Sequence, residues 1–341
     1  MRDGAVATNR GLIFSTKIKV SVYMPSISIA VSSYNQLEFL KQALDSVTTQ
    51  TVPYDEIIVT DDASTDDSPA FLAEWEKQGP NRRVIFLKTN QGRGSVRNIA
   101  IKEMQGDYLA FLDGDDWLEP RAAENVRKVL DQSAPDLVAA RTNFFDHDTN
   151  SFVKRGHVNP FYSMDVFSKG TLTTPSERAG LFRILPAHWQ KVHRAEFMRE
   201  NGIGCHFETY EDIPWHHQAV VRAREVVCID APIVNYRQHQ HSILKTPWEG
   251  HFVLFDVVDD CDRFMTQDDR SDPVLHRASR LFLFNLMAFS LLHSPRVPED
   301  LKPAFANKIL EREHMFDFEM NEWEAGMLAG VRDIASGANG Q

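Results

Sequence analysis

Three aspartates gather around one glycine at the end of a short apolar run. Residues 108–112 are apolar and lead directly into Asp113-Gly-Asp-Asp116. Carboxylates this close repel one another unless a cation lies between them, and Mg²⁺ and Mn²⁺ take oxygen ligands. Mg²⁺ is commonly held by one or two carboxylates together with substrate phosphates. The spacing therefore predicts a metal-bound phosphate ester or diphosphate, with a solvated acidic turn as the alternative.

Two other polar turns follow apolar runs earlier in the chain. They are Ser32-Ser-Tyr-Asn35 and Asp61-Asp-Ala-Ser64. An aromatic ring can stack on a base, a carboxylate can accept a hydrogen bond from a ring N–H, and a cation can hold a diphosphate. Taken with the acid cluster, these turns predict a nucleotide-linked substrate.

An alternation of strands and helices positions the three turns. Between residues 26 and 141 each apolar run is followed by polar turn residues, which predicts an α/β fold with a parallel sheet covered by helices. Ligands bind where the carboxyl ends of such strands meet. The expected strands are Ser28–Val31, Glu56–Thr60, Arg83–Leu87, Tyr108–Leu112 and Asp136–Ala140. The expected helices are Leu37–Val47, Ser68–Gln78, Gly94–Met104 and Arg121–Leu130.

The remainder of the chain is less regular. We expect loops over residues 142–180, helices almost throughout from Phe252, and an extra edge strand at Ile18–Tyr23. The apolar run Leu281–Leu292 is too short to span a bilayer and predicts a core helix or a contact surface. Residues 335–341 are small and polar and are expected to fray.

Composition restricts the function class. The 341 residues carry a formal net charge of 37 − 48 = −11, which argues against a nucleic-acid-binding protein. The three cysteines, Cys205, Cys228 and Cys261, are far apart, which favours reduced thiols and a cytoplasmic protein. The first residues lack the apolar core of a signal peptide, so none is expected. A peripheral contact with the inner membrane face stays open.

Several motifs in order resemble one enzyme family. SSYNQLEFLKQALDSVTTQ, EIIVTDDASTDDS, NQGRGSVRNIAI and GDYLAFLDGDDWLEP are similar to the nucleotide-binding half of the family 2 inverting glycosyltransferases with the GT-A fold. HWQKVHRAEFMRENGIGCHFETYEDIPW and IVNYRQHQHSI are similar to the acceptor half of bacterial polysaccharide-type members. The resemblance implies a GT-A domain at residues 26–245, divided at residue 141, after an N-terminal extension at 1–25 and before a helical region at 246–341.

On the donor side, the resemblance assigns roles residue by residue. Ser32 and Tyr34 would line the base pocket, and Asp62 would accept the uracil N–H of a UDP-sugar. Asp113 and Asp115 match the DXD element, in which the second acid is the usual metal ligand and the first contacts ribose or metal-bound water. Asp116 would assist. One departure is Ala63, where many members carry glycine, and this leaves the turn type open.

Arg97 and Asn98 match positions near the donor, where a guanidinium can pair with the diphosphate. A surface helix arginine is the alternative. In Tyr236-Arg-Gln-His-Gln-His-Ser242, the resemblance implies a segment that folds over the diphosphate. We expect His239, rather than His241, to complete the metal shell and Arg237 to bind phosphate.

On the acceptor side, Glu211-Asp212 resembles the family's ED motif, whose aspartate is the catalytic base. A helix-capping acid is the alternative for Asp212. Four further residues are candidates for lining the acceptor site: His188, Trp189, His216 and His217. For Trp189, a buried aromatic is the preferred interpretation.

The sequence thus predicts a Mn²⁺- or Mg²⁺-dependent transfer from a nucleotide-sugar donor, with UDP expected, to a saccharide or glycolipid acceptor in polysaccharide synthesis. A nucleotidyltransferase or phosphohydrolase, and a non-catalytic binding module, remain as alternatives. The helical region could pack on the acceptor side, form a homo-oligomer contact or rest against a membrane. The donor sugar and the linkage depend on loop shapes that short motifs do not specify.

Overall fold

The computed structural model describes residues 24–153, 161–239 and 246–337. The edge strand expected at Ile18–Tyr23 and His241 lie outside these ranges. So does the end of the tail, and the expected domain boundary at residue 245 falls beside a gap.

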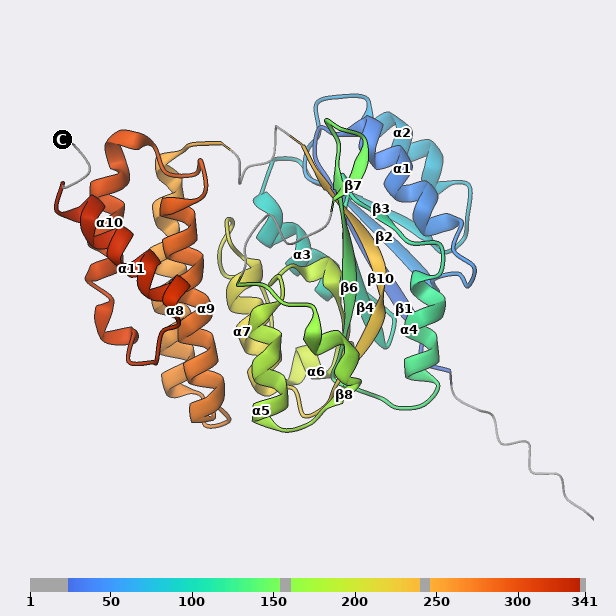
Figure 1. Ribbon diagram of the computed structural model, residues 1–341. Coiled ribbons are helices and arrows are strands. Elements are labelled where there is room, and N and C mark those ends of the chain that lie inside the picture. The colour runs from blue at the N-terminus through green and yellow to red at the C-terminus, as the bar shows by residue number, and fades with distance from the viewer. Residues whose placement is uncertain (1–23, 154–160, 240–245, 338–341) are drawn as a thin grey trace, which may run out of the picture.

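A single mixed sheet forms the centre of the fold (Figure 1). Its order is β3-β2-β1-β4-β9-β6-β10-β5, with β7 beside β6 and β8 beside β10. Strands β3, β2, β1 and β4 are mutually parallel, and β9 runs antiparallel between β4 and β6. The strands are β1 (Ile27–Ser33), β2 (Glu56–Asp61), β3 (Arg82–Phe86), β4 (Tyr108–Asp113), β5 (Trp117–Leu118), β6 (Leu137–Asp146), β7 (Ser151–Val153), β8 (Thr171–Leu172), β9 (Lys191–Arg194) and β10 (Val226–Gln238).

The register of the parallel strands brings the predicted turns to one edge. Ser32 lies opposite Thr60 on β2 and opposite Asp113 on β4, and Ser33 lies opposite Asp61. All three strands therefore end at the same level, and the polar residues that follow them are neighbours. This confirms the expectation that the turns share the carboxyl edge of the sheet.

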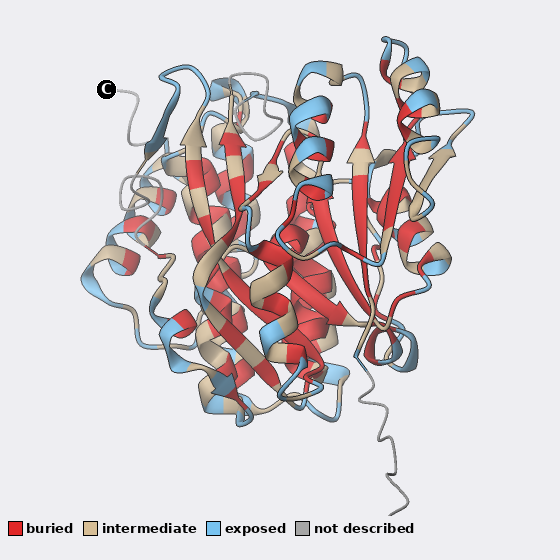
Figure 2. Ribbon diagram, turned by 90° about the vertical axis from the view of Figure 1, so that its right-hand side faces the viewer, coloured by how far each residue is buried: buried red, intermediate tan, exposed pale blue. Residues whose placement is uncertain are grey.

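Helices cover both faces of the sheet, as the alternation of side chains along β1 requires. Ile27, Ile29 and Val31 pack into one hydrophobic cluster with α1 and α4, whereas Ala30 packs into the other. Figure 2 shows the buried strands between these layers. The helices of this part are α1 (Leu37–Thr48), α2 (Ser68–Glu76), α3 (Gly92–Glu103), α4 (Ala122–Leu130), α5 (Pro175–Arg178), α6 (Ala195–Glu200) and α7 (Asp212–Arg222).

The region expected to be a loop, residues 142–180, is more regular than predicted. Strand β6 continues to Asp146 and pairs with β7, and β8 and α5 follow. The prediction was wrong for these segments because both faces of the β6 extension carry aromatic side chains. Phe144 is buried, and on the other face Phe145 packs on Trp117 and Phe152 with ring centroids 5.0 and 5.3 Å apart. Such a strand shows no clear apolar–polar period.

The C-terminal region is helical, as expected, and shares a core with the α/β part. Its helices are α8 (Val253–Gln267), α9 (Pro273–Leu292), α10 (Lys302–Leu310) and α11 (Glu322–Ala335). They pack beside α7 and α5 (Figure 1), and one hydrophobic cluster includes Trp215 of α7 together with Val257 and Phe282 of this region. Most of the Leu281–Leu292 run is buried, which confirms a core helix. Within the described ranges, every helix is too short or too polar to cross a bilayer.

Candidate active site

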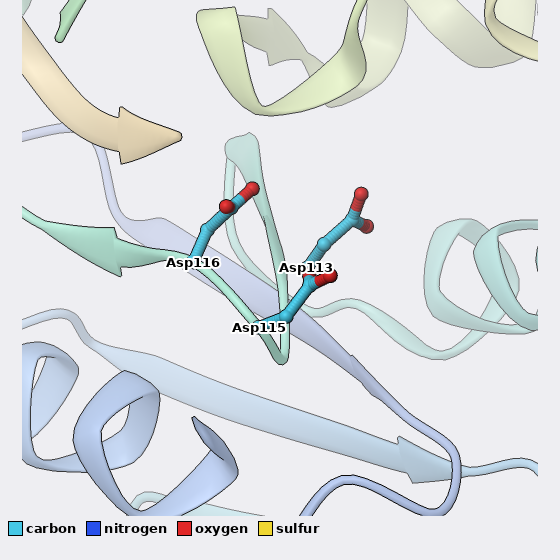
Figure 3. Close-up of side chains that lie close together, drawn as sticks. All are labelled: Asp113, Asp115 and Asp116. Carbon is cyan, nitrogen blue, oxygen red and sulfur yellow. The ribbon is translucent and has the colours of Figure 1, made fainter. Parts of the chain in front are cut away.

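The acid cluster occupies a tight turn between β4 and β5 (Figure 3). The amide of Asp116 donates to the carbonyl of Asp113 at 3.0 Å, which closes the turn. Gly114 is needed here because a Cβ at this position would lie 2.5 Å from the carbonyl oxygen of Ser32. Oxygens of Asp113, Asp115 and Asp116 lie within 4.8 Å of one another. The turn therefore brings three carboxylates to one point at the edge of the sheet.

The three carboxyl groups have unequal environments. Burial raises the pKa of Asp113, but Arg97, Arg93 and a hydrogen bond from Ser32 outweigh it and hold that pKa below its ordinary value. Burial and the two neighbouring carboxylates raise the pKa of Asp116 well above its ordinary value. One oxygen of Asp116 accepts from the amide of Arg237 at 2.7 Å, while its Oδ2 is buried without a hydrogen-bond partner among the described residues.

This donor set fits a hard divalent cation. Asp115 and Asp113 are partly exposed, and Nε2 of His239 lies 3.3 Å from Oδ2 of Asp115. A cation would be drawn to carboxylates that now repel one another, one of which has a buried oxygen without a partner. His239 thus lies beside the acid that the sequence singled out, and direct ligation by it stays a prediction.

Arg237 is hydrogen-bonded to the acid turn. Its Nε donates to the carbonyl of Asp115 at 2.7 Å and its Nη2 to Oε1 of Gln42 at 2.6 Å. The guanidinium carbon lies 4.7 Å from the ring centroid of Phe39 and 4.6 Å from that of Trp117, a cation–π contact with each. These contacts tie the turn to α1. A contact between Arg237 and phosphate stays a prediction.

The residues predicted for the base pocket lie beside this turn. Oγ of Ser32 donates to Asp113 at 3.1 Å, and Tyr34 is 46% exposed, with its ring free to meet a ligand face. Asp62 is buried, and its two oxygens accept from the amides of Gln91 and Gly92 at 2.7 and 2.9 Å. Each carboxylate oxygen retains a second lone pair for a further N–H donor.

The backbone between these turns carries two left-handed residues. Ala63 has φ +61°, a conformation that costs a residue with a Cβ roughly 1–2 kcal/mol. A glycine at this position would avoid that cost. Asn35 has φ +50°, its amide donates to Oγ of Ser64 at 2.9 Å, and its Oδ1 accepts from the amide of Thr65 at 2.7 Å. Sequence reasoning missed Asn35, although asparagine is enriched in this conformation.

Arg97 connects the two halves of the site. It is 4% exposed, and its Nη2 donates to Oδ1 of Asp113 at 2.7 Å while its Nη1 donates to Oε1 of Glu211. The side chain is therefore an internal bridge, not the surface arginine of the alternative interpretation. Its predicted contact with the donor diphosphate stays a prediction. Asn98 exchanges two hydrogen bonds of 2.8 Å with the backbone of Cys205 and ties α3 to the acceptor half.

The candidate base Asp212 is the first residue of α7. Burial and the neighbouring Glu211 carboxylate raise the pKa of Asp212 to about 7, against the opposing charges of Arg97 and Lys191. A carboxylate with this pKa can accept a proton near neutral pH, where an ordinary aspartate is a weaker base.

Lys191 is a buried cation that sequence reasoning missed. Its Nζ donates to the carbonyls of Leu185, Pro186 and Ala187 at 3.2, 3.0 and 2.9 Å. Burial lowers the pKa of Lys191 to about 7. Lysine is almost never fully buried unless it is paired. The HWQKVHR segment is mostly polar, so its pattern carried no signal that Lys191 would be buried.

The four residues suggested for the acceptor site lie in the core. His188, Trp189, His216 and His217 are at most 5% exposed. Trp189 stacks on Tyr236 with centroids 5.2 Å apart, which confirms the buried aromatic. The acceptor-lining role of the three histidines was wrong, because their rings are buried among aromatic side chains such as Phe111, Phe182 and Phe282. His217, for example, bonds the carbonyl of Ile213 within its own helix at 2.8 Å.

A continuous chain of contacts therefore joins the predicted site. Asp62 follows β2, Ser32 on the adjacent strand bonds Asp113, and Arg97 carries the connection to Glu211 beside Asp212. A small hollow of about 10 Å³, room for about one water molecule, lies between β1, β4 and α3, with Ser32, Arg97 and Asp113 in its wall. The acids after separate strands and the acid of the later half share one edge of the molecule.

Known proteins resemble this chain in sequence and in fold. Residues 28–190 match the family described as Glycosyl transferase family 2. EpsH and EpsJ of Bacillus subtilis (strain 168), both named as glycosyltransferases, are each 28% identical over 229 residues, covering 65% and 66% of this chain and 63% and 65% of those proteins. The chain thus spans slightly less than two thirds of the length of these relatives. Chondroitin synthase of Escherichia coli is 34% identical over 145 residues, 42% of this chain and 21% of that protein.

The fold extends the likeness over nearly the whole chain. S. aureus TarS 1–349 in complex with UDP-GlcNAc superposes with a TM-score of 0.73 and 19% identity, covering 93% of this chain and 92% of that chain. Because this coverage includes the helical C-terminal region, both the GT-A architecture and its helical extension are confirmed. Residues 28–190, slightly less than half of the chain, thus match glycosyltransferase family 2, and the ordered motifs and the fold agree with that match.

Proposed function

We propose that the protein is a metal-dependent inverting glycosyltransferase. It moves a sugar from a nucleotide-sugar donor, UDP-linked, to a hydroxyl of a saccharide or glycolipid acceptor in the synthesis of a polysaccharide or glycoconjugate. The match to family 2 and the likeness to EpsH and EpsJ support the reaction class, and the name of chondroitin synthase supports the setting. The TarS complex with UDP-GlcNAc supports a UDP-sugar as the donor.

The observation that carries the proposal is the bridge that Arg97 forms between Asp113 of the nucleotide-binding half and Glu211 of the acceptor half. It joins Asp113 of the acid turn to Glu211, the neighbour of the candidate base Asp212, through one buried guanidinium, which supports a shared site. One half of the site is suited to hold a diphosphate, and the other to accept a proton. An inverting transfer requires both functions at one sugar carbon.

On the donor side, the nucleotide would lie across the ends of β1, β2 and β4. Asp62 accepts the uracil N–H, the ring of Tyr34 stacks on the base, and Ser32 and Asp113 contact the ribose. Asp115 and Asp113 would hold Mn²⁺ or Mg²⁺, with His239 beside them and Asp116 assisting. A cation at this position neutralises charge that develops on the departing diphosphate.

On the acceptor side, Asp212 removes the proton of the attacking hydroxyl. A general base in reach of that proton contributes roughly 10²- to 10⁴-fold to the rate. The hydroxyl oxygen attacks the anomeric carbon opposite the bond to the diphosphate, so that bond breaks as the new one forms and the configuration inverts. The proton stays on Asp212, whose pKa of about 7 allows its return to solvent near neutral pH.

A panel of nucleotide sugars with Mn²⁺ and a mixture of saccharide acceptors tests the proposal. Free nucleoside diphosphate and a glycosylated product should appear with one donor, and NMR of the product should show an inverted anomeric configuration. Release of pyrophosphate in place of nucleoside diphosphate would indicate a nucleotidyltransferase. An absence of heat in calorimetry with UDP and Mn²⁺ would indicate a scaffold without donor binding.

Two substitutions assign the roles within the same assay. Asp212→Asn should reduce transfer by roughly 10²- to 10⁴-fold while the UDP dissociation constant stays within about twofold. Asp269→Asn is a matched control, because the Asp269 side chain is 97% exposed. The base assignment is wrong if Asp212→Asn retains most of the wild-type rate.

A further inference from the structure

The residue before the ED pair has an unusual backbone. Tyr210 has φ +60°, in the left-handed region that bulky side chains rarely adopt. Its carbonyl accepts from the amide of Ile213 at 3.1 Å, so this residue leads directly into the first turn of α7. Strained residues of this kind persist only where the surroundings hold them, and they cluster at functional sites.

Two side chains of the C-terminal region hold Tyr210 in place. Its hydroxyl lies 2.8 Å from Nδ1 of His251, which belongs to the 3₁₀ turn Glu249–Phe252 at the start of α8. Nε2 of His251 lies 3.1 Å from the carbonyl oxygen of Thr246. Because a carbonyl only accepts, Nε2 carries the proton, and Nδ1 then accepts from the tyrosine O–H. Arg296, in the connection after α9, also hydrogen-bonds the Tyr210 side chain.

The contact of Tyr210 with His251 and Arg296, called the anchor below, is buried, and Arg296 makes further hydrogen bonds. Tyr210 is 7% exposed and His251 is 1% exposed. Nη1 of Arg296 donates to Oγ of Ser290 at 3.0 Å, and its carbonyl accepts from the amide of Trp248 at 3.0 Å. Water therefore has little access to these hydrogen bonds, and the loss of one partner would leave the other unsatisfied.

The ED pair is thus held from two sides. Glu211 accepts a hydrogen bond from Arg97 of α3, and the side chain of the preceding Tyr210 is hydrogen-bonded to His251 and Arg296 of the helical region. We propose that the C-terminal helical region positions the candidate base, with Tyr210 and His251 as positioning residues that hold the backbone from which Asp212 projects. This inference rests on the proposed function, because it takes Asp212 as the base.

The matched substitutions His251→Asn and His251→Gln test it. Asparagine can place an acceptor near the position of Nδ1 and keep the tyrosine hydrogen bond. Glutamine places its amide near Nε2, keeps the contact with the Thr246 carbonyl and removes that acceptor. Tyr210→Phe removes the hydroxyl alone and keeps the ring, so this variant also conserves the packing around Tyr210.

A misplaced base should affect turnover and not donor binding. We expect Tyr210→Phe and His251→Gln to lower kcat by roughly 10- to 100-fold, since small misplacements of catalytic groups have effects of this order. The KM for the nucleotide sugar and the UDP dissociation constant should stay within about twofold, and His251→Asn should recover most of the lost kcat. Thermal unfolding of each variant is measured alongside.

The outcomes separate this inference from the proposed function. If Asp212→Asn retains transfer, the base assignment fails and the positioning role fails with it. If Asp212→Asn is inactive while Tyr210→Phe and His251→Gln turn over at the wild-type rate, only the positioning role is overturned. It is also overturned if His251→Asn is as slow as His251→Gln, or if UDP affinity falls in parallel with kcat, because packing of the region would then explain the loss.

Discussion

The acid turn after β4 and the start of α7 present the same side chain in opposite electrostatic settings. Both Asp113 and Asp212 lie beside Arg97 and one or more other carboxylates. For Asp113, nearby arginines and a serine hydroxyl outweigh burial, and its pKa falls below the ordinary value. For Asp212, burial and Glu211 outweigh Arg97 and Lys191, and its pKa rises to about 7.

This difference follows from how Arg97 distributes its hydrogen bonds. It donates directly to Asp113 and to Glu211, and no described hydrogen bond joins it to the Asp212 side chain. Asp113 therefore gains a partner for its charged form, whereas Asp212 meets the negative charge of Glu211 without such a bond. Where the pKa values of two carboxyl groups are shifted in opposite directions, the group with the lower pKa keeps its negative charge and the group with the higher pKa accepts the proton.

Removal of Asp115, the predicted metal ligand beside Asp113, should have the largest effect. Asp115→Ala takes away the carboxylate nearest His239, and we expect transfer to fall on the order of 10³-fold or more, since metal and oxyanion stabilisation carries a large part of such barriers. Chelation of the wild type with EDTA should cause a similar loss, and added Mn²⁺ should restore the wild type but not Asp115→Ala. Full activity of the wild type in EDTA would contradict metal dependence.

Loss of the bridge should disturb both regions at once. Arg97→Met leaves Asp113 and the buried Glu211 without their shared cation, and we expect the free energy of unfolding to fall by about 3–5 kcal/mol. Denaturant unfolding measures this loss. The double variant Arg97→Met, Glu211→Gln removes the orphaned charge of Glu211 and should recover part of it. An unchanged unfolding midpoint for Arg97→Met would show that the bridge contributes nothing to the fold.

The acid turn was predictable from sequence because its geometry is local. An apolar run that ends in Asp113-Gly-Asp-Asp116 places its carboxylates at a strand end, and parallel strand ends meet at one edge. The connection to Asp212 was not predictable, because Arg97 and Glu211 are 114 positions apart in the chain. A helical signal did exist: Gly94, Arg97 and Ala100 recur at intervals of three residues, and all are buried.

The anchoring of the base illustrates the same limit. Family resemblance identified Asp212 as the candidate, but the support of Tyr210 by His251 depends on how the C-terminal helices pack against α7. Helical periodicity predicted those helices and not their docking. The strand β6 was missed beyond Ala140 for a related reason, since its outer face is covered by Phe152 and Trp117 from other segments.

A smaller effect is expected on nucleotide affinity, which tests recognition of the base separately from the roles of Asp113 and Asp212. Asp62→Asn puts an amide N–H where the carboxylate accepted hydrogen bonds, and we expect UDP to bind about tenfold more weakly, about 1.4 kcal/mol. Cytosine lacks the N3–H of uracil, so CDP affinity should change less. Calorimetry with UDP and CDP for both proteins measures the difference. Equal losses for the two nucleotides would show that Asp62 supports the loop at Gln91 and Gly92 without reading the base.

The smallest expected effect is a shift in the pH dependence of kcat, which tests the contrast between Asp113 and Asp212. Asp212 must be ionised to accept a proton, so kcat should fall below a pH of about 7 and level off above it. In Glu211→Gln, a negative neighbour that raises the pKa of Asp212 is gone and Arg97 is freed toward it. Both changes favour the carboxylate, and the acid limb should move to lower pH by about one unit.

Because the pKa of Asp113 is already below its ordinary value, titration of that group cannot produce a limb near neutrality. A kcat–pH profile that coincides with the wild type would mean that Glu211 does not set the basicity of Asp212, and the contrast between the two regions would then rest on burial alone.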